Sequence, residues 1–338
     1  MKNKILYCTL NLLFTLTACQ KKSDTPLDTY LVTSSTVANQ SDLETTSVRE
    51  GWKNVNTHYT YHFTGEIDHK YAFDLYLKID ENKVSGSYNY VKYETPIPIE
   101  GTINDTYLEF TEAAGHVFKG VFDFNNGRVS GYWTDAITGN SLPFTMANPK
   151  GKGYPQKEYK VYVIEKAPAT DTYYVKYIQE KDQYDNVIQI PLDSQLWESE
   201  NSDKFDLYLE DYNFDGYLDL CVFHHLPSKH TYFLYNVEGY DYIENPSYNT
   251  LYSVVFATDF RKKLLYEYTD HKEVQQSIYQ YQAGKLLRIY HCSNKNTQGG
   301  NSLLKKYYHY VNGNQKLINE RTFKQLYGQK VLQPLNDE

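Results

Sequence analysis

The chain repeats a pattern of alternating apolar residues at an interval of 45 residues. The aligned pairs are residues 71–79 with 116–124, residues 83–86 with 128–131, and Pro98 with Pro143. The register holds without a gap from residue 71 to residue 99. Because successive side chains on a strand point to opposite faces, this alternation indicates a sheet with one dry face. The repeat therefore predicts two copies of one β-meander.

Turn-forming residues divide each copy into short strands. Asp80-Glu81-Asn82 and Asn125-Asn126-Gly127 interrupt the apolar pattern at equivalent places. Two copies supply about eight short strands, which predicts a small antiparallel barrel or a curved meander sheet. Closure into a barrel would leave no exposed strand edge. We expect its interior to be filled by side chains rather than to hold a ligand.

A segment rich in proline and glycine, Pro149 to Pro155, follows the second copy. Such a segment cannot continue a strand ladder, so it marks a domain boundary. The sequence thus predicts an all-β chain with a repeat domain at 51–150 and a second β domain at 154–338. In the second domain, residues 307–311 followed by Asn312-Gly313-Asn314 form a strong hairpin signal.

The first 19 residues have the pattern of a signal peptide. Lys2 and Lys4 precede a mostly apolar run, which ends at Leu16-Thr17-Ala18-Cys19. Small residues before a cleavage site fit a signal peptidase, and the run is too short to span a membrane. These four residues resemble the bacterial lipobox. The resemblance implies that Cys19 carries the lipid, palmitate included, and that the chain is a lipoprotein cut before Cys19.

Residues 20–50 form a polar stretch rich in serine and threonine, which predicts a flexible tether. Charged residues directly after the lipidated cysteine resemble the surface-export signals of lipoproteins from the Bacteroidetes group. Gln20, rather than an aspartate, gives no reason for retention at the inner membrane. We therefore expect the lipid to anchor the chain in the outer membrane. The chain could be attached to either the periplasmic or the external face.

Charge and composition restrict the partners. A net charge of -8 argues against nucleic acid, whose binding needs clustered Lys and Arg. The 36 tyrosines fit half-buried strand faces, and the alternative is an aromatic surface for sugars or peptides. Cys221 and Cys292 remain after the signal, and we favour free thiols over a disulfide.

The most specific chemical pattern is Asp211-Tyr212-Asn213-Phe214-Asp215-Gly216-Tyr217-Leu218-Asp219. Oxygen-bearing side chains at positions 1, 3, 5 and 9, with glycine at position 6, are typical of a calcium loop. The expected ligands are Asp211, Asn213, Asp215, the Tyr217 carbonyl and Asp219. Position 12 is Val222 and a strand pattern follows, so an EF-hand is excluded. The alternative is a turn whose carboxylates only cap backbone amides.

Residues 206–290 resemble a domain of bacterial envelope lipoproteins with FG-GAP-like or propeller-like sheets. The resemblance rests on residues 215–220, the aromatic strand 232–236 and the segment 256–260 before residues 263–265. It implies propeller-like sheets with bound, structural calcium. The family includes immunity proteins that neutralise a lysozyme-like effector. Their inhibitory loop has no counterpart here that can be matched residue by residue.

Three classes of function remain open. The favoured class is a non-enzymatic envelope binding protein, with an inhibitor or immunity-type factor as one form. The alternative is a surface module that binds a glycan or peptide. A hydrolase using Asp203, Asp206 and Glu210 is disfavoured, because such carboxylates act only at defined separations. For His224, His225 and His230, surface positions are favoured over a metal site.

Overall fold

The computed structural model describes residues 50–93, 95–165, 172–198, 205–224, 229–251, 255–269, 275–297, 300–311 and 314–328. The predicted signal peptide, Cys19 and nearly all of the tether, together with Asp203 and His225, lie outside the described residues. The all-β prediction is confirmed: strands dominate, and the described part contains a single α-helix. Among the described residues, no helix is long and apolar enough to cross a membrane.

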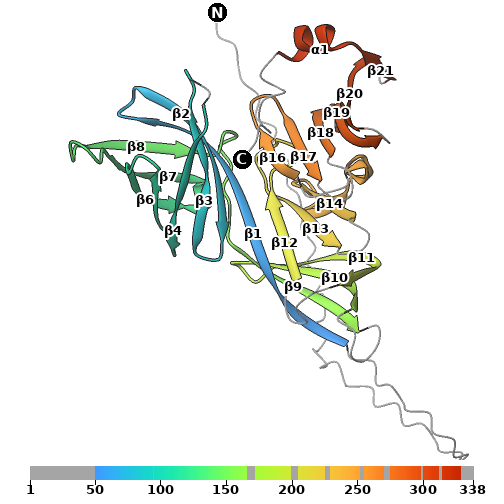
Figure 1. Ribbon diagram of the computed structural model, residues 1–338. Helices are drawn as coiled ribbons and strands as arrows, with labels where there is room; N and C mark the ends of the chain where they lie inside the picture. The colour runs from blue at the N-terminus through green and yellow to red at the C-terminus, as the bar shows by residue number, and fades with distance from the viewer. Residues whose placement is uncertain are drawn as a thin grey trace, which may run out of the picture. The chain divides into compact units, whose positions relative to one another are not determined.

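Strands β1–β8 close into an antiparallel barrel, which confirms the predicted barrel (Figure 1). Each strand pairs with the next, and residues 64–67 of β1 pair with residues 144–147 of β8 to close the ring. The strands are β1 (Glu50–Ile67), β2 (Tyr71–Asp80), β3 (Lys83–Tyr90), β4 (Ile97–Asn104), β5 (Tyr107–Glu112), β6 (Val117–Asp123), β7 (Arg128–Thr134) and β8 (Ser141–Ala147). A short 3-10 helix, η1 (Phe124–Asn126), joins β6 to β7.

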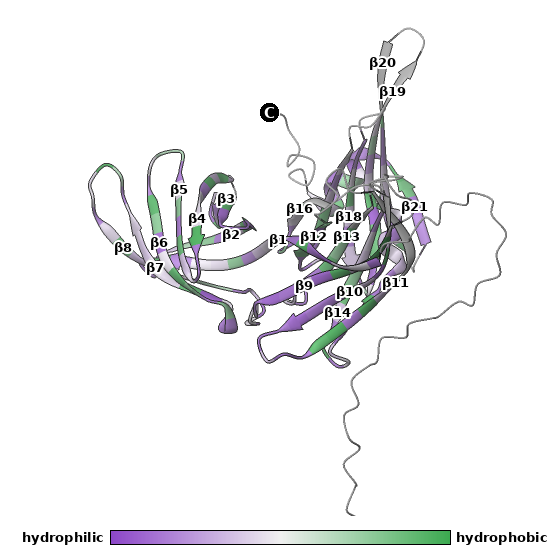
Figure 2. Cartoon of the chain, turned by 90° about the horizontal axis from the view of Figure 1, so that it is seen from below, coloured by the Kyte–Doolittle hydropathy of each residue, from purple (hydrophilic) through white to green (hydrophobic). Residues whose placement is uncertain are grey.

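The 45-residue repeat accounts for this topology. Its first copy supplies β2, β3 and β4, and its second supplies β6, β7 and β8 at the same spacing. Equivalent apolar positions point inward and are buried in both copies: Phe73 and Phe118, Leu77 and Phe122, Val84 and Val129, Ile99 and Phe144. These side chains belong to one core cluster that fills the barrel interior, as the sequence predicted. In Figure 2, hydrophobic and hydrophilic residues are interspersed along the strands, as this inward and outward alternation requires.

Strand β1 is longer than the barrel needs and also belongs to the rest of the sheet. Its first residues, 50–54, pair with β9 (Lys157–Glu165), which in turn pairs with β10 (Thr172–Asp182) and β11 (Val187–Glu198). Residues 55–59 of β1 pair in parallel with β12 (Phe205–Glu210). From β12 the sheet continues through β13 (Asp219–His224), β14 (Lys229–Asn236) and β15 (Asp241–Glu244). This sharing of β1 was not predicted from the sequence.

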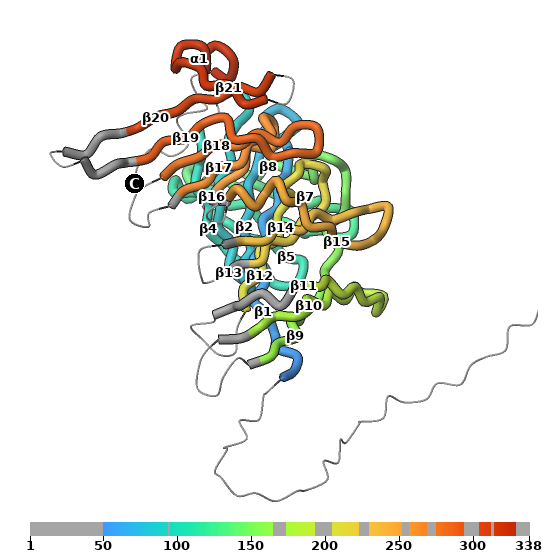
Figure 3. Tube along the Cα trace, turned by 90° about the vertical axis from the view of Figure 1, so that its right-hand side faces the viewer, coloured from blue at the N-terminus to red at the C-terminus, as the bar shows by residue number. Residues whose placement is uncertain are grey.

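The remaining strands form a second antiparallel sheet in chain order, visible as successive orange-to-red segments in Figure 3. They are β16 (Val255–Asp259), β17 (Leu264–Thr269), β18 (Gln275–Gln282), β19 (Lys285–Thr297), β20 (Gly300–Val311) and β21 (Asn314–Ile318). The 3-10 helix η2 (Pro246–Thr250) precedes this sheet and helix α1 (Glu320–Tyr327) follows it. The predicted hairpin is confirmed by the pairing of β20 with β21.

His58 joins three strands at the middle of β1. Its imidazole lies 3.1 Å from the Asp206 carboxylate on β12 and 3.3 Å from the Asp80 carboxylate on β2. The ring also stacks on Tyr208, with centroids 4.7 Å apart. The hydrogen bond with Asp206 raises the pKa of His58 above 6.5, and the nearby negative charges add to the effect.

We predict that substitution of the barrel glycine Gly131 by alanine lowers the free energy of unfolding. A Cβ on Gly131 would lie 1.9 Å from the Lys119 carbonyl oxygen, so the strand pair β6–β7 would have to separate. Overpacking of this kind costs about 1–3 kcal/mol. Urea denaturation measures the loss. Gly51→Ala is the matched control, since nothing lies within 4 Å of its Cβ position, and an equal loss in both variants would contradict the prediction.

We also predict that the contribution of His58 to stability depends on pH. Because folding raises its pKa, the contribution is fully present below about pH 6.5 and is lost as the pH rises through the folded-state pKa. The loss of unfolding free energy in His58→Gln should therefore be larger at pH 5.5 than at pH 8.5, by about 1 kcal/mol for this partly exposed pair. In an Asp206→Asn background the difference should shrink. A pH-independent effect of His58→Gln would refute this assignment.

Candidate functional site

The predicted calcium loop connects β12 to β13, so it leads into a strand as the sequence indicated. The side chains at positions 1, 3 and 5 converge. Asp211 Oδ1 and Asn213 Oδ1 both accept a hydrogen bond from the Asp215 amide, at 3.0 Å each. Asp215 Oδ2 accepts one from Asn213 Nδ2 at 3.0 Å. The turn requires positive φ angles at Phe214 and Gly216, of 64° and 97°.

Position 9 of the loop faces a different set of groups. Asp219 Oδ2 accepts hydrogen bonds from the amides of Tyr212 and Asn213, and its Oδ1 accepts one from the Tyr235 amide on β14. The Tyr217 amide donates to Asp215 Oδ1 at 2.9 Å. The carboxylates of the loop thus cap backbone amides, which is the alternative arrangement that the sequence left open. The described residues include no group of three or more His, Cys, Asp or Glu side chains placed to hold a metal ion.

Burial dominates the electrostatics of this loop. It raises the pKa of Asp211 to about 7, and the charge of Asp215 adds to the shift. Burial also raises the pKa of Asp219 well above its usual value, with Asp211 contributing. The amides that donate to both carboxylates oppose these shifts.

The carboxylates before the loop do not form a paired acid and base. Asp206 and Glu210 lie four residues apart on β12, which separates them by about 13 Å along an extended strand. Asp206 bonds to His58, and the buried Glu210 lies 3.0 Å from His62 Nε2.

A hydroxyl group completes the contacts of His62. Thr258 on β16 donates to Glu210 Oε1 at 2.6 Å, and its oxygen lies 2.8 Å from His62 Nε2. The carboxylate and the hydroxyl therefore meet the same ring nitrogen. In a nucleophilic triad the carboxylate holds the opposite ring nitrogen, so this geometry is that of a structural link between β1, β12 and β16.

The remaining histidine and cysteine predictions have separate outcomes. His230 is 1 % exposed on β14, so the expected surface position is wrong for this residue. His225 lies outside the described residues, and the side chain of His224 is also not described. Cys221 and Cys292 are buried free thiols in different core clusters.

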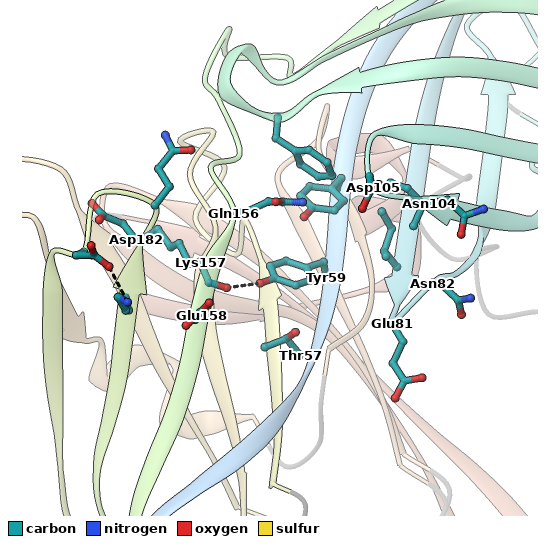
Figure 4. Close-up of a pocket in the computed structure, with 17 residues that line it drawn as sticks. Thr57, Tyr59, Glu81, Asn82, Asn104, Asp105, Gln156, Lys157, Glu158 and Asp182 are labelled. Atoms are coloured by element: carbon teal, nitrogen blue, oxygen red, sulfur yellow. Dashed lines mark hydrogen bonds and ion pairs between the residues drawn. The ribbon is translucent and has the colours of Figure 1, made fainter.

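A cleft of about 690 Å³ lies at one mouth of the barrel (Figure 4). Its floor is aromatic. Tyr59 and Tyr61 on β1 stack with parallel rings 5.7 Å apart, and Phe124 of η1 lies beside them in the same core. Tyr61 is buried, whereas Tyr59 and Phe124 are half-buried. The Tyr59 hydroxyl donates to the Lys157 carbonyl at 3.4 Å and so joins the floor to β9.

Tight turns form the rim of the cleft. Figure 4 shows Glu81, Asn82, Asn104 and Asp105 on the barrel side, and Gln156, Lys157 and Glu158 on the opposite side. Glu81 and Asn82 form the β2–β3 turn, Asn104 ends β4, and Asp105 begins the β4–β5 turn. The backbone takes left-handed φ angles of 54° at Glu81 and 53° at Asp105. Such angles cost a non-glycine residue about 1 kcal/mol.

The two lysines of the cleft are already neutralised. Lys157 Nζ lies 2.6 Å from the buried Glu180 carboxylate and above the Tyr235 ring. Lys181 Nζ pairs with Asp185 at 2.6 Å. Glu81, Asp105 and Glu158 therefore leave the rim with a negative charge. This cleft was not predicted from the sequence, because its residues come from six separate segments.

Comparisons with known proteins give no family. No family model and no curated protein matches the chain. One solved structure that matches this chain is that of a Xanthomonas type IV secretion system related protein, with 10% sequence identity and a TM-score of 0.32. The match covers 65% of this chain and 97% of the other.

Proposed function

We propose that this chain is a lipid-anchored binding protein of the bacterial outer membrane that performs no chemistry of its own. The observation that carries the binding role is the cleft at the barrel mouth. Asn82, Asn104, Asp105 and Gln156 line this cleft, and within the described part of the chain their side chains make no hydrogen bond to protein. Polar groups placed in this way are ready to bind a ligand.

The anchoring role rests on the lipobox residues, Leu16 to Cys19, and on the polar segment that follows them. A single acyl chain binds a membrane only weakly, so stable anchoring needs more than one chain. A diacylated Cys19 meets this requirement. An inhibitor or immunity-type role is one form of the same proposal, and it rests on the resemblance of residues 206–290 to envelope domains.

We include a structural calcium ion in the proposal. Asp211, Asn213 and Asp215 bring carboxylate and amide oxygens together within one turn, and calcium binds such hard oxygen ligands on a flexible loop. An ion there would hold the turn between β12 and β13. Asp219 already accepts hydrogen bonds from three backbone amides. To bind the ion as well, one of its carboxylate oxygens would have to contact calcium while keeping these hydrogen bonds.

The prediction for the anchor concerns Cys19. In Gram-negative cells fed an alkyne analogue of palmitate, we expect the wild-type chain to be labelled and to sediment with membranes. Cys19→Ser should lose both the label and the sedimentation, because no other thiol takes the lipid. Cys8→Ser is the matched control within the same segment and should keep the label. Undiminished labelling of Cys19→Ser would refute the anchor.

The prediction for calcium concerns thermal stability. With calcium at about 100 times its Kd, binding should add about 2.7 kcal/mol to the free energy of unfolding. For a chain of this size that corresponds to a rise in Tm of about 5 °C relative to a chelator. Asp215→Ala should abolish the rise.

The control for calcium is Asp135→Ala. Asp135 also caps backbone amides, those of Ile137 and Thr138, but it stands in a barrel turn away from the loop. This variant should lose stability equally with calcium and with chelator, and should retain the calcium-dependent rise. Identical melting of the wild-type protein in both buffers would exclude the ion.

A further inference from the structure

The cleft at the barrel mouth has a composition that restricts its ligand. Nine of its 17 lining residues are Asp, Asn, Glu or Gln, and three are aromatic. Its volume of about 690 Å³ falls within the range of roughly 300–1,000 Å³ that is typical of small-molecule sites. Because the barrel interior is filled, a ligand can enter only as far as the floor formed by Tyr59 and Phe124.

The polar groups of the rim can both donate and accept hydrogen bonds. The amides of Asn82, Asn104 and Gln156 offer both functions, and the carboxylates of Glu81 and Asp105 accept only. A sugar hydroxyl also donates and accepts, so adjacent hydroxyls on a ring match planar amide and carboxylate groups. A ligand with only donors or only acceptors would leave some of these groups without a partner.

The floor suits the apolar face of a sugar ring. Tyr59 and Phe124 are half-buried and present ring surface to the cleft, and the C–H face of a pyranose packs against such surfaces. Tyr59 is held in place by its stacking on Tyr61 and by its hydrogen bond to the Lys157 carbonyl. A floor that is fixed before binding reduces the entropy lost on binding.

Charge selects among saccharides. The lysines that line the cleft are engaged by Glu180 and Asp185, whereas Glu81, Asp105 and Glu158 remain on the rim. A negative rim repels uronic acids, sialic acids and phosphorylated sugars. The left-handed backbone at Glu81 and Asp105 holds both residues in tight turns at this mouth.

We propose that the barrel-mouth cleft binds a short neutral saccharide, with rings packed on Tyr59 and Phe124 and hydroxyls bonded to Asn104, Asp105 and Gln156. This inference rests on the proposed binding function. It adds the place where the ligand binds and the chemical class of that ligand. It does not depend on the lipid anchor or on calcium.

The test uses the full-length chain in detergent micelles and isothermal titration calorimetry. The neutral probes are hexamers of glucose in α-1,4 and β-1,4 linkage, of mannose, of galactose, of xylose and of N-acetylglucosamine. The acidic probe is hexagalacturonate and the basic probe is hexalysine. We expect at least one neutral hexamer to bind at micromolar to millimolar concentration, and hexagalacturonate to bind at least tenfold more weakly or not at all.

Two variants on opposite walls locate the site. Asn104→Ala, at the end of β4, and Gln156→Ala, before β9, should each weaken saccharide binding at least tenfold. Both residues are exposed and make no side-chain hydrogen bond within the described part of the chain, so their replacement should leave the melting temperature unchanged. Asn314→Ala is the matched control, because Asn314 is an exposed asparagine at the start of β21.

The outcomes separate this inference from the proposed function. If no neutral hexamer binds, the saccharide assignment is wrong. If hexalysine alone binds and Asn104→Ala abolishes it, the cleft takes a basic peptide, so the binding function survives while the ligand class is overturned. If Asn314→Ala weakens saccharide binding as much as Asn104→Ala does, the cleft is not the site. Failure of the proposed anchor would appear only in the labelling of Cys19.

Discussion

The structure depends on the backbone pairing of one strand, β1. Its 18 residues pair in succession with β9, β12, β2 and β8, so the same segment closes the barrel and starts both other arms of the large sheet. Buried backbone amides and carbonyls must form hydrogen bonds, and β1 supplies hydrogen-bonding partners to four other strands. Displacing β1 by one residue would turn every inward side chain outward. A single register therefore fixes the barrel and the strands beside it together.

Alternation along β1 gives its two faces different chemistry. Tyr59, Tyr61 and Phe63 point toward the barrel core and the cleft. His58 and His62 point to the opposite face, where each meets a carboxylate of β12. The pair of His62 and Glu210 is buried, and leaving a buried hydrogen-bonding group without its partner costs about 1–3 kcal/mol. The histidine–carboxylate contacts on one face of β1 therefore fix this strand in place. On its other face, β1 positions the tyrosines that form the floor of the cleft.

The sequence predicted those features that a short stretch of chain determines by itself, such as strands and turns. The 45-residue repeat predicted the strands of the barrel, since the inward positions of β2 and β6 carry Phe73 and Phe118 with the same period. The strand that the sequence predicted after the loop from Asp211 to Asp219 is β13. The pairing of Val55 with Phe205 could not be predicted in this way, because it joins segments 150 residues apart and leaves no periodic mark. His230 was misassigned because it belongs to strand β14, between β13 and β15, whereas its polar neighbours in the sequence suggested a surface loop.

The cleft could not be predicted from the sequence, because it too is formed by segments that are far apart along the chain. A barrel of alternating strands places every second turn at the same mouth, so the β2–β3 and β4–β5 turns meet there with η1. The opposite wall comes from β9 and the β10–β11 turn, which β1 brings to this mouth through its pairing with β9. Turn residues such as Asp80 to Lys83 are polar in any hairpin, and only their convergence makes them a candidate binding surface. Because a filled core fixes the floor and β1 fixes both walls, the cleft is formed before any ligand arrives, which is the condition under which a few hydrogen bonds to a small ligand yield useful affinity.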